Sequence, residues 1–389
     1  MSVRYEAPPR SSYKTRSTPL RHVLFRAPPR DFDSRGPWAV DLPLTCGAGP
    51  ASEMITSIRS GKSSTMMSSV VRLHPRLLSL SEFFTSLAGR AFTLRKPDGE
   101  RFWQLLTTLS PIAGQMLARG GQMEEVLYGF GNGARFGPYD LPPILVTALP
   151  HLTRDCEALY DEMGSVVRSG ARAPLGQHYQ YLFEWLCRRF DRERVVERSG
   201  SSLLFVPALA RMFNGAKFVH LYRDGRDAAI SMQRHPFFRL SVRFAGLFER
   251  MGLDPYRPPF LFGTSRLYPL LEAVTGRFLP VERWLAEPPP LETIGRYWSR
   301  TIVSGAKFLD ALGRERVLSL RYEDILARPR EELARLMEFM GPEYADSEWL
   351  TQASAIPRKP WSKWQKLPAD QQERLTDACR PGLALLAYA

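Results

Sequence analysis

The sequence predicts an α/β fold, namely a single P-loop-like three-layer α/β/α domain with a central parallel sheet and helical insertions. Short apolar runs typical of strands alternate with longer segments of helical character, and this alternation is typical of parallel sheets. The chain has 389 residues, 44% of them apolar and 24% charged, which is enough for one large core. Two predicted strands end in turns rich in cations and hydroxyls, where parallel sheets bind their ligands.

Each predicted strand is a short apolar run, and each predicted helix has an amphipathic period or a start signal. The first strand, 54–58, leads through a glycine turn into a helix at 63–74. An amphipathic helix is expected at 177–190. In chain order the further strands are 77–80, 195–197, 217–222 and 317–321, the further helices are 205–213, 295–312 and 330–340, and residues 83–175 have the character of helices and loops.

The N-terminal segment differs in composition from the rest of the chain. Residues 1–36 carry eight Lys and Arg against three acidic residues, with several prolines and little apolar periodicity. We therefore expect a basic, Pro-rich arm over residues 1–50 and the folded domain over 51–389. Two interpretations of the arm remain open, a surface tail or a tether to anionic lipid or to a partner.

Charge and cysteine usage restrict the partners and the compartment. The net charge of +13 fits a nucleic acid, an anionic membrane surface or a polyanionic cofactor, and no nucleic-acid-binding motif supports the first. Four scattered cysteines without metal-ligand spacing indicate reduced thiols in a cytoplasmic protein. No apolar leader and no 18-residue apolar run is present in the sequence. Peripheral contact with the inner face of the membrane stays open, and the oligomeric state is not encoded visibly.

The first of the two anion-binding segments follows strand 54–58. Backbone N–H groups at a helix N-terminus bind phosphate-like anions, and nearby cations strengthen that binding. The glycine turn supplies amides, hydroxyls and two cations together. The candidate residues are Arg59, Ser60, Gly61, Lys62, Ser63 and Ser64.

The second segment follows strand 217–222 and begins at Arg223. Ser231 lies eight residues further on, where a following helix could return its hydroxyl to the anion held by Arg223. Asp224 and Arg226 are expected to organise this loop internally. Two anion sites at two strand ends suggest one ligand with two separated phosphate-like groups.

These segments resemble those of the sulfotransferases that use 3′-phosphoadenosine 5′-phosphosulfate (PAPS). The family's R-D-G-R-D-x-x-x-S pattern is matched from Arg223 to Ser231, and residues 58–63 stand where the family has P-[KR]-S-G-T-T. The resemblance runs from about residue 54 to 364. It implies transfer of the sulfuryl group of PAPS to a hydroxyl, without a metal ion, because Lys and Arg neutralise the transferred and leaving groups.

The resemblance also implies the catalytic residues. Glu82, which soon follows an H-P pair at His74, matches the general base of the branch that includes the tyrosylprotein enzymes. Arg59 matches the cation on the 5′-phosphosulfate, and Arg198 falls where that branch has a sulfuryl-stabilising Lys. The alternatives are a capping carboxylate or a pair with a nearby arginine for Glu82, and a surface pair with Glu197 for Arg198. His74 itself is expected to be structural.

Further cofactor contacts are implied by two late segments. Tyr322, in a Y-E-D-I-L segment, would approach the nucleotide, with a plain core tyrosine as the alternative. Lys359, in a K-P-W-S-K-W segment, is the carried-over contact near the C-terminus, and Lys363 is a weaker choice.

Two other functions remain open. Residues 56–63 form a Walker A pattern except that Thr56 replaces its first Gly, so a P-loop ATP-dependent kinase is the nearest alternative. A β-branched residue at that position counts against triphosphate binding. A non-catalytic nucleotide-binding module is the other alternative.

The acceptor side is expected in two segments that match the family poorly, 83–175 and 232–290. The second is rich in bulky apolar residues, which form either a packed core or an apolar mouth for a lipophilic acceptor. Bacterial members of the family sulfate lipids, glycolipids, quinones and polyketides. The resemblance therefore implies a small lipophilic acceptor, whose nucleophile the sequence does not identify as alcohol, phenol or amine.

Overall fold

The computed structural model describes residues 52–57, 62–118, 126–131, 133–200, 202–256, 280–357 and 362–388. The arm predicted over residues 1–50 lies outside these residues, as does part of the second insertion. All described residues belong to one unit, Leu42–Ala389.

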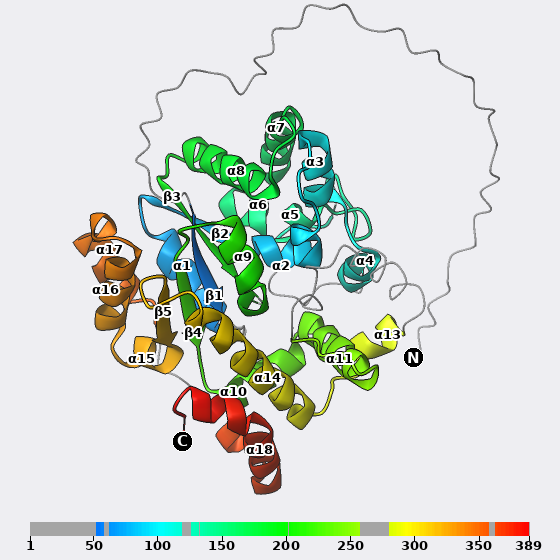
Figure 1. The fold of residues 1–389 in the computed structure, drawn as a ribbon, viewed down its shortest axis with the longest axis vertical. Coiled ribbons are helices and arrows are strands. Elements are labelled where there is room, and N and C mark those ends of the chain that lie inside the picture. Colours follow the sequence, from blue (N-terminus) through cyan, green and yellow to red (C-terminus); the bar gives the residue numbers. More distant parts are fainter. Residues whose placement is uncertain are drawn as a thin grey trace, which may run out of the picture. The chain divides into compact units, whose positions relative to one another are not determined.

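A five-stranded parallel sheet organises this unit (Figure 1). Its strand order is β2–β3–β1–β4–β5, so β1 lies centrally between β3 and β4. All five strands were predicted from their apolar runs, and the parallel α/β prediction is confirmed. The strand bounds are β1 (Ser52–Ser57), β2 (Leu77–Ser81), β3 (Arg194–Ser199), β4 (Phe218–Tyr222) and β5 (Val317–Arg321).

Helices connect the strands and cover both faces of the sheet. In chain order they are α1 (Lys62–Arg72), α2 (Phe83–Leu87), α3 (Gly99–Thr107), α4 (Pro111–Ala118), α5 (Pro143–Val146), α6 (Ala148–Leu152), α7 (Cys156–Arg168), α8 (Leu175–Arg189), α9 (Val206–Met212), α10 (Gly225–Arg234), α11 (Pro236–Arg250), α13 (Val281–Ala286), α14 (Leu291–Asp310), α15 (Tyr322–Ala327), α16 (Pro329–Met340), α17 (Ser347–Ser354) and α18 (Ala369–Leu385). Short 3-10 helices are η1 (Ala88–Phe92), η2 (Ser202–Phe205), η3 (Pro342–Tyr344) and η4 (Trp364–Lys366).

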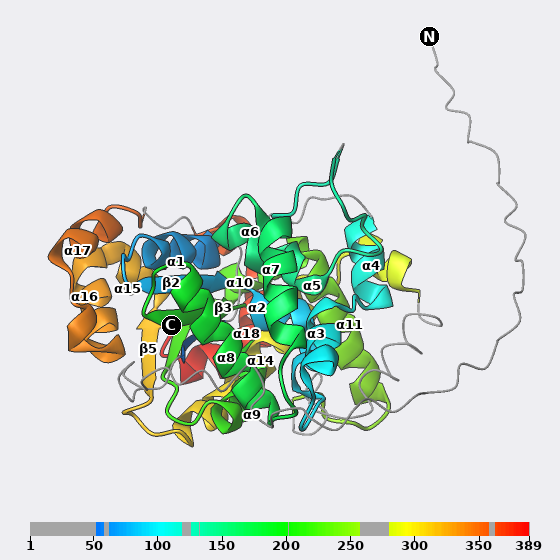
Figure 2. The ribbon, with the colours of Figure 1, turned by 90° about the horizontal axis from the view of Figure 1, so that it is seen from above.

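Two apolar cores lie on opposite faces of the sheet and make three layers. Side chains alternate between the faces along each strand. On β4, Phe218 packs into one core, whereas Val219 and Leu221 pack into the other. The second core is covered by α1, α16 and α17, which are blue and orange in Figure 2. The first is covered by the larger set of helices, including α2, α8 and α14.

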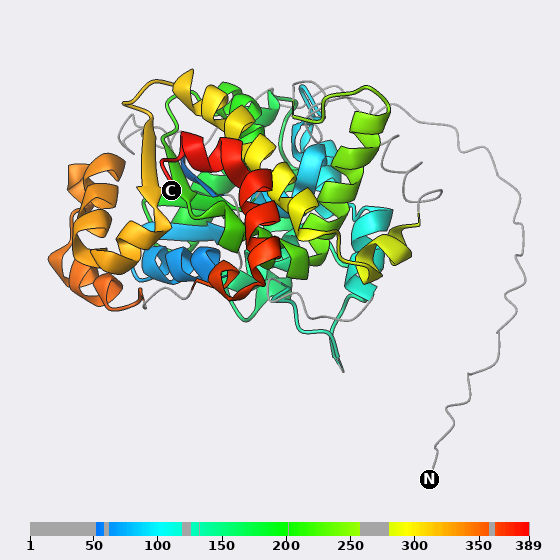
Figure 3. The same cartoon turned by 90° about the horizontal axis from the view of Figure 1, so that it is seen from below.

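Helix α18, which the sequence analysis did not predict, packs along α14 (Figure 3). Trp298 of α14 is 1% exposed and lies between two glycines of neighbouring helices. A Cβ atom at Gly382 of α18 would lie 2.7 Å from its ring, and one at Gly225 of α10 would lie 2.2 Å from it. These two glycines therefore allow α18 and α10 to approach α14 closely. No helix in the described ranges is long and apolar enough to cross a membrane.

Candidate functional site

Several predicted site residues that the structure describes lie at one edge of the sheet, because the carboxyl ends of parallel strands lie together. Glu82 follows β2, Arg198 lies near the end of β3, Arg223 follows β4 and Tyr322 follows β5. The first turn of α1 contains Lys62, Ser63 and Ser64. Arg59, Ser60, Gly61 and Lys359 lie outside the described residues.

Glu82 is held in a strained and buried position between β2 and α2. It is 2% exposed, and its backbone adopts the left-handed conformation, with φ of 55°. Its N–H group donates to the carbonyl of Arg198 at 2.8 Å. Its carboxylate Oε2 accepts the N–H of Gly200 at 3.2 Å. The end of β3 thus fixes both the backbone and the side chain of Glu82.

Arg198 forms a buried ion pair with Glu82. Its Nη1 lies 3.5 Å from Glu82 Oε1, and the two side chains are 4% and 3% exposed. Its Nη2 also donates to the hydroxyl of Ser81 at 2.6 Å. The alternative of a surface pair between Arg198 and Glu197 is wrong, because adjacent residues of a strand point to opposite faces.

His151 lies near the pair of Glu82 and Arg198, although nothing in the sequence predicted this. Its Nε2 lies 3.4 Å from the hydroxyls of both Ser68 and Ser79. Burial, followed by the charge of Arg198, lowers the pKa of His151 to about 4, so the ring is neutral at pH 7. His151 lies far from Glu82 in sequence on the short helix α6, and no local pattern links the two.

Arg223 and Ser231 meet as the sequence predicted. Arg223 Nη2 donates to Ser231 Oγ at 2.8 Å and to the carbonyl of Asp227 at 2.5 Å. Both partners are neutral oxygens, although the guanidinium is charged. Within the described structure, Arg223 Nε is buried and has no hydrogen-bond partner. Burial lowers the pKa of Arg223 to about 10, which is the effect expected for a desolvated cation.

The loop that carries Arg223 is organised by its own charged residues, as expected. Asp224 accepts from the backbone N–H of Arg226 at 2.8 Å and thereby caps α10. The Arg226 guanidinium pairs with the same carboxylate at 2.7 Å. It also lies 3.8 Å from the ring centroid of Trp364.

The two late segments lie beside this loop. Tyr322 is half-buried at the start of α15, and burial raises its pKa while the charge of Arg223 opposes that rise. The N–H group of Lys363 donates to Asp227 Oδ1 at 2.7 Å. The hydroxyl of Ser362 is buried and has no partner among the described residues. Tyr322, Arg223 and the segment that begins at Ser362 therefore belong to one region.

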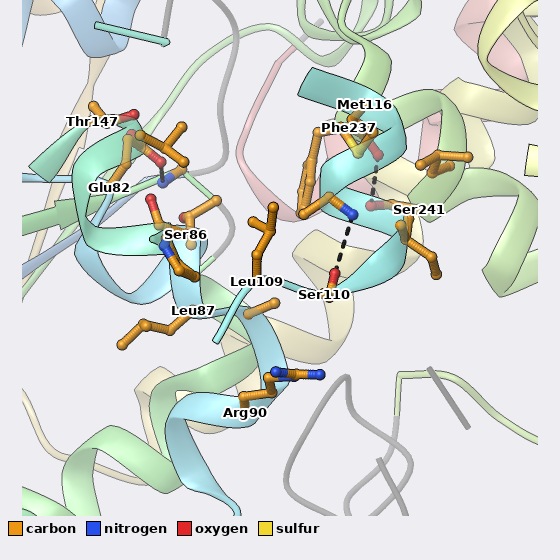
Figure 4. Close-up of a pocket in the computed structure, with 18 of the residues that line it drawn as sticks. Glu82, Ser86, Leu87, Arg90, Leu109, Ser110, Met116, Thr147, Phe237 and Ser241 are labelled. Carbon is orange, nitrogen blue, oxygen red and sulfur yellow. Dashed lines mark hydrogen bonds between the residues drawn. The ribbon is translucent and has the colours of Figure 1, made fainter. Parts of the chain in front are cut away.

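Glu82 is also one of the residues that line a cavity of about 210 Å³ (Figure 4). Its walls are mostly apolar, and both predicted insertions contribute to them. Figure 4 shows Glu82 and Thr147 on one wall, with Phe237 and Met116 across from them and Arg90 at a separate place on the lining. Aromatic residues of the second insertion therefore line a cavity rather than only a packed core.

His74 has a structural role, as the sequence analysis favoured. It is 1% exposed, and its Nε2 lies 2.9 Å from the carbonyl of Tyr344. Its ring packs edge-on against Trp349, with 5.5 Å between the centroids. Burial lowers its pKa. His74 therefore joins α1 to the region of η3 and α17.

No family model matches the sequence, and no curated protein is significantly similar to it. Among solved structures, the sulfotransferase domain from the curacin biosynthetic pathway is similar at 15% identity and a TM-score of 0.43, over 88% of this chain and 98% of that chain. The sulfotransferase domain from a Synechococcus olefin synthase is similar at 17% identity and a TM-score of 0.39, over 88% and 96%. The sulfotransferase from Alicyclobacillus acidocaldarius is similar at 16% identity and a TM-score of 0.41, over 88% and 97%. Because these TM-scores are low, the function of this chain has to be argued from its own residues.

Proposed function

We propose that this protein is a sulfotransferase that moves the sulfuryl group of PAPS to a hydroxyl of a small lipophilic acceptor. The observation that carries the proposal is the half-buried guanidinium of Arg223. Its partners are neutral oxygens, and its Nε lacks a partner in the described structure. Asp227, Glu323 and Asp224 act on the guanidinium only through their charges, so a half-buried cation in this state is further stabilised by an anion in direct contact with it. The motif resemblance supports the 3′-phosphate of PAPS as that anion.

The chemistry requires little beyond positioning and charge stabilisation. The acceptor oxygen attacks sulfur, and the bond between sulfur and the 5′-phosphate oxygen breaks in line with it. The products are a sulfate ester and 3′-phosphoadenosine 5′-phosphate (PAP). Glu82 takes the proton of the attacking hydroxyl. Arg198, whose Nη1 lies 3.5 Å from the Glu82 carboxylate, is the cation beside the base, and we assign it the stabilisation of charge on the sulfuryl group.

The cofactor residues divide between its two ends. Arg223 and Ser231 hold the 3′-phosphate, with Tyr322 and Lys359 beside the nucleotide. The 5′-phosphosulfate is held by the glycine turn and the start of α1, through Arg59, Ser60, Gly61, Lys62, Ser63 and Ser64. We expect no metal to be needed, so activity should survive EDTA.

The acceptor binds in the apolar cavity beside Glu82. A lipophilic acceptor fits because most lining residues are apolar. Glu82 is the carboxylate on the cavity wall, where it can take the proton of the acceptor hydroxyl.

Ala113 of α4 also lines this cavity. We expect Ala113→Phe to raise the acceptor KM at least tenfold and to leave PAP affinity unchanged, since a larger ring occupies acceptor space. The control is Ala334→Phe, at an exposed position of α16. Unchanged acceptor kinetics in Ala113→Phe would place the acceptor elsewhere.

Calorimetry with PAP and with ATP separates the three functions. A sulfotransferase binds PAP far more tightly, because ATP lacks the 3′-phosphate that Arg223 and Ser231 recognise. Equal or tighter binding of ATP would reject the proposal in favour of the kinase. Tight PAP binding without turnover on any lipophilic hydroxyl would instead indicate a binding module.

Arg223→Ala tests the observation that carries the proposal. The variant should bind PAP at least tenfold more weakly, because a phosphate loses a charge-assisted partner at a desolvated site. Arg250→Ala is the control, since Arg250 is exposed in the last turn of α11. PAP affinity that is unchanged in Arg223→Ala would show that this loop does not hold the cofactor.

A further inference from the structure

Helix α2 begins in an unusual way. Glu82 occupies the N-cap position, but its side chain makes no capping hydrogen bond. A carboxylate at this position ordinarily accepts an N–H group from the first turn of its own helix. The Glu82 carboxylate instead accepts from Gly200, pairs with Arg198 and lies on the cavity wall. Another part of the chain must therefore satisfy the first turn of α2.

That part is β3, whose side chains cap α2 in place of Glu82. The N–H of Phe84 donates to Glu197 Oε1 at 3.3 Å, and the N–H of Thr85 donates to Ser199 Oγ at 3.1 Å. The hydroxyl of Ser199 donates its own proton to the same Glu197 oxygen. Glu197 and Ser199 are both 0% exposed. Being two residues apart on a strand, they face the same side of the sheet.

Glu197 is suited to this task because burial raises its pKa to about 8, which keeps it neutral at pH 7. As a neutral acid it accepts hydrogen bonds from α2 and places no second negative charge beside Glu82. Glu82 and Glu197 thus have different roles, since only Glu82 contacts the cavity and the arginine.

We propose that Glu197 and Ser199 are positioning residues that cap α2 from β3, so that the Glu82 carboxylate stays turned toward the cavity instead of toward its own helix. The proposal deepens the proposed function, because it explains how the base is held. Without the caps, the unsatisfied N–H groups of Phe84 and Thr85 would attract the Glu82 carboxylate and draw it from the acceptor.

Hydrogen exchange tests the capping without reference to any activity. In Ser199→Ala and Glu197→Met, protection of the Phe84 and Thr85 amides should fall about fivefold, the loss expected for a removed cap. Glu197→Gln keeps an accepting oxygen and should retain the protection of Phe84. Unchanged protection in both Ser199→Ala and Glu197→Met would overturn the proposal, whatever reaction the protein catalyses.

Turnover tests whether the caps act through Glu82. Ser199→Ala and Glu197→Met should lower kcat about 10- to 100-fold with PAP affinity unchanged, because a base displaced by an ångström loses that much. Glu197→Gln should restore most of the rate.

In a Glu82→Gln background, Glu197→Met should cause little further loss, since the base is already absent. A full additional loss in that background would show that Glu197 acts on folding or cofactor binding and not on Glu82. A wild-type protein without sulfuryl transfer would reject the proposed function while leaving the exchange result valid.

Discussion

At the scale of single residues, the proposed chemistry depends most on Glu82. Glu82→Gln should bind PAP normally and lose turnover about 10²–10⁴-fold, because Gln keeps the side-chain shape but accepts no proton. Its amide oxygen can still accept the Gly200 N–H that now donates to Glu82 at 3.2 Å. The loss should appear in kcat, since the lost interaction is made in the transition state. Single-turnover sulfuryl transfer together with calorimetry measures both quantities.

Glu338→Gln is a matched control for this variant, because Glu338 is exposed on α16. The rate loss in Glu82→Gln should be smaller for an acidic phenol than for an alkyl alcohol, which needs the base more. Near wild-type turnover with the preferred acceptor would remove Glu82 from the mechanism. His74 would not replace it, since its ring contacts Tyr344 and Trp349 on the structural side of α1.

What the sequence reveals of these residues depends on how local their signals are. Arg223 and Ser231 lie on one turn-and-helix segment, so spacing alone predicted their contact. Glu197 and His151 have no such local signal. Their proximity to Glu82 comes from the pairing of β2 with β3 and from the packing of α6 against β2. Only the tertiary fold joins these segments.

At the scale of elements, the contact between α10 and α14 fixes the proposed 3′-phosphate site. Helix α10 carries Ser231 and begins at Gly225, where an added Cβ would lie 2.2 Å from the Trp298 ring. Gly225→Ala should therefore force α10 away from α14, lower the melting temperature and weaken PAP binding. Thermal unfolding and calorimetry measure the two effects.

Gly246→Ala is the matched control for that prediction. Gly246 lies in α11, and a Cβ there meets no atom within 4 Å. Alanine in a helix interior is favoured over glycine by up to about 1 kcal/mol, so this variant should be slightly more stable. Equal melting temperatures for the two variants would show that the contact with Trp298 does not constrain α10.

The elements themselves were predictable in proportion to the strength of their periodicity. Every strand of the sheet was expected within a few residues of its observed bounds, because each is a short apolar run between turn signals. Helix α18 was not expected. Only a few of its 17 residues are buried, chiefly Leu375, Cys379 and Leu383, and Pro381 lies within the helix. Few apolar residues and an internal proline give a weak helical signal.

At the scale of the whole molecule, buried histidines should make the fold sensitive to acid. Burial lowers the pKa of His220 to about 4 from an ordinary 6.5. His151 is lowered to about 4 as well. The unfolded chain then binds more protons than the folded chain between these values, so stability present above pH 6.5 is lost as the pH falls toward 4. Urea unfolding at pH 7 and pH 4.5 should show this loss.

His220→Leu should reduce that acid loss. The His220 ring is 3% exposed, and its Nε2 has no hydrogen-bond partner among the described residues, so an apolar replacement leaves no described group unsatisfied. The difference in stability between the variant and the wild type should be smaller at pH 7 than at pH 4.5. At pH 4.5 the variant should be the more stable protein. An identical pH dependence in both proteins would contradict the lowered pKa.

Glu197 should act in the opposite direction, because its pKa is raised from 4.5 to about 8. Between these values the folded chain retains a proton that the unfolded chain has lost, so stability falls as the pH rises through this range. In Glu197→Gln this fall should be absent, because Gln does not titrate. The stability advantage of the variant, measured by urea unfolding, should therefore grow from pH 5 to pH 8 and then level off. A difference that is constant over this range would show that Glu197 is ionised in the folded protein, so that a charged carboxylate beside Glu82, and not a neutral acid, would cap α2.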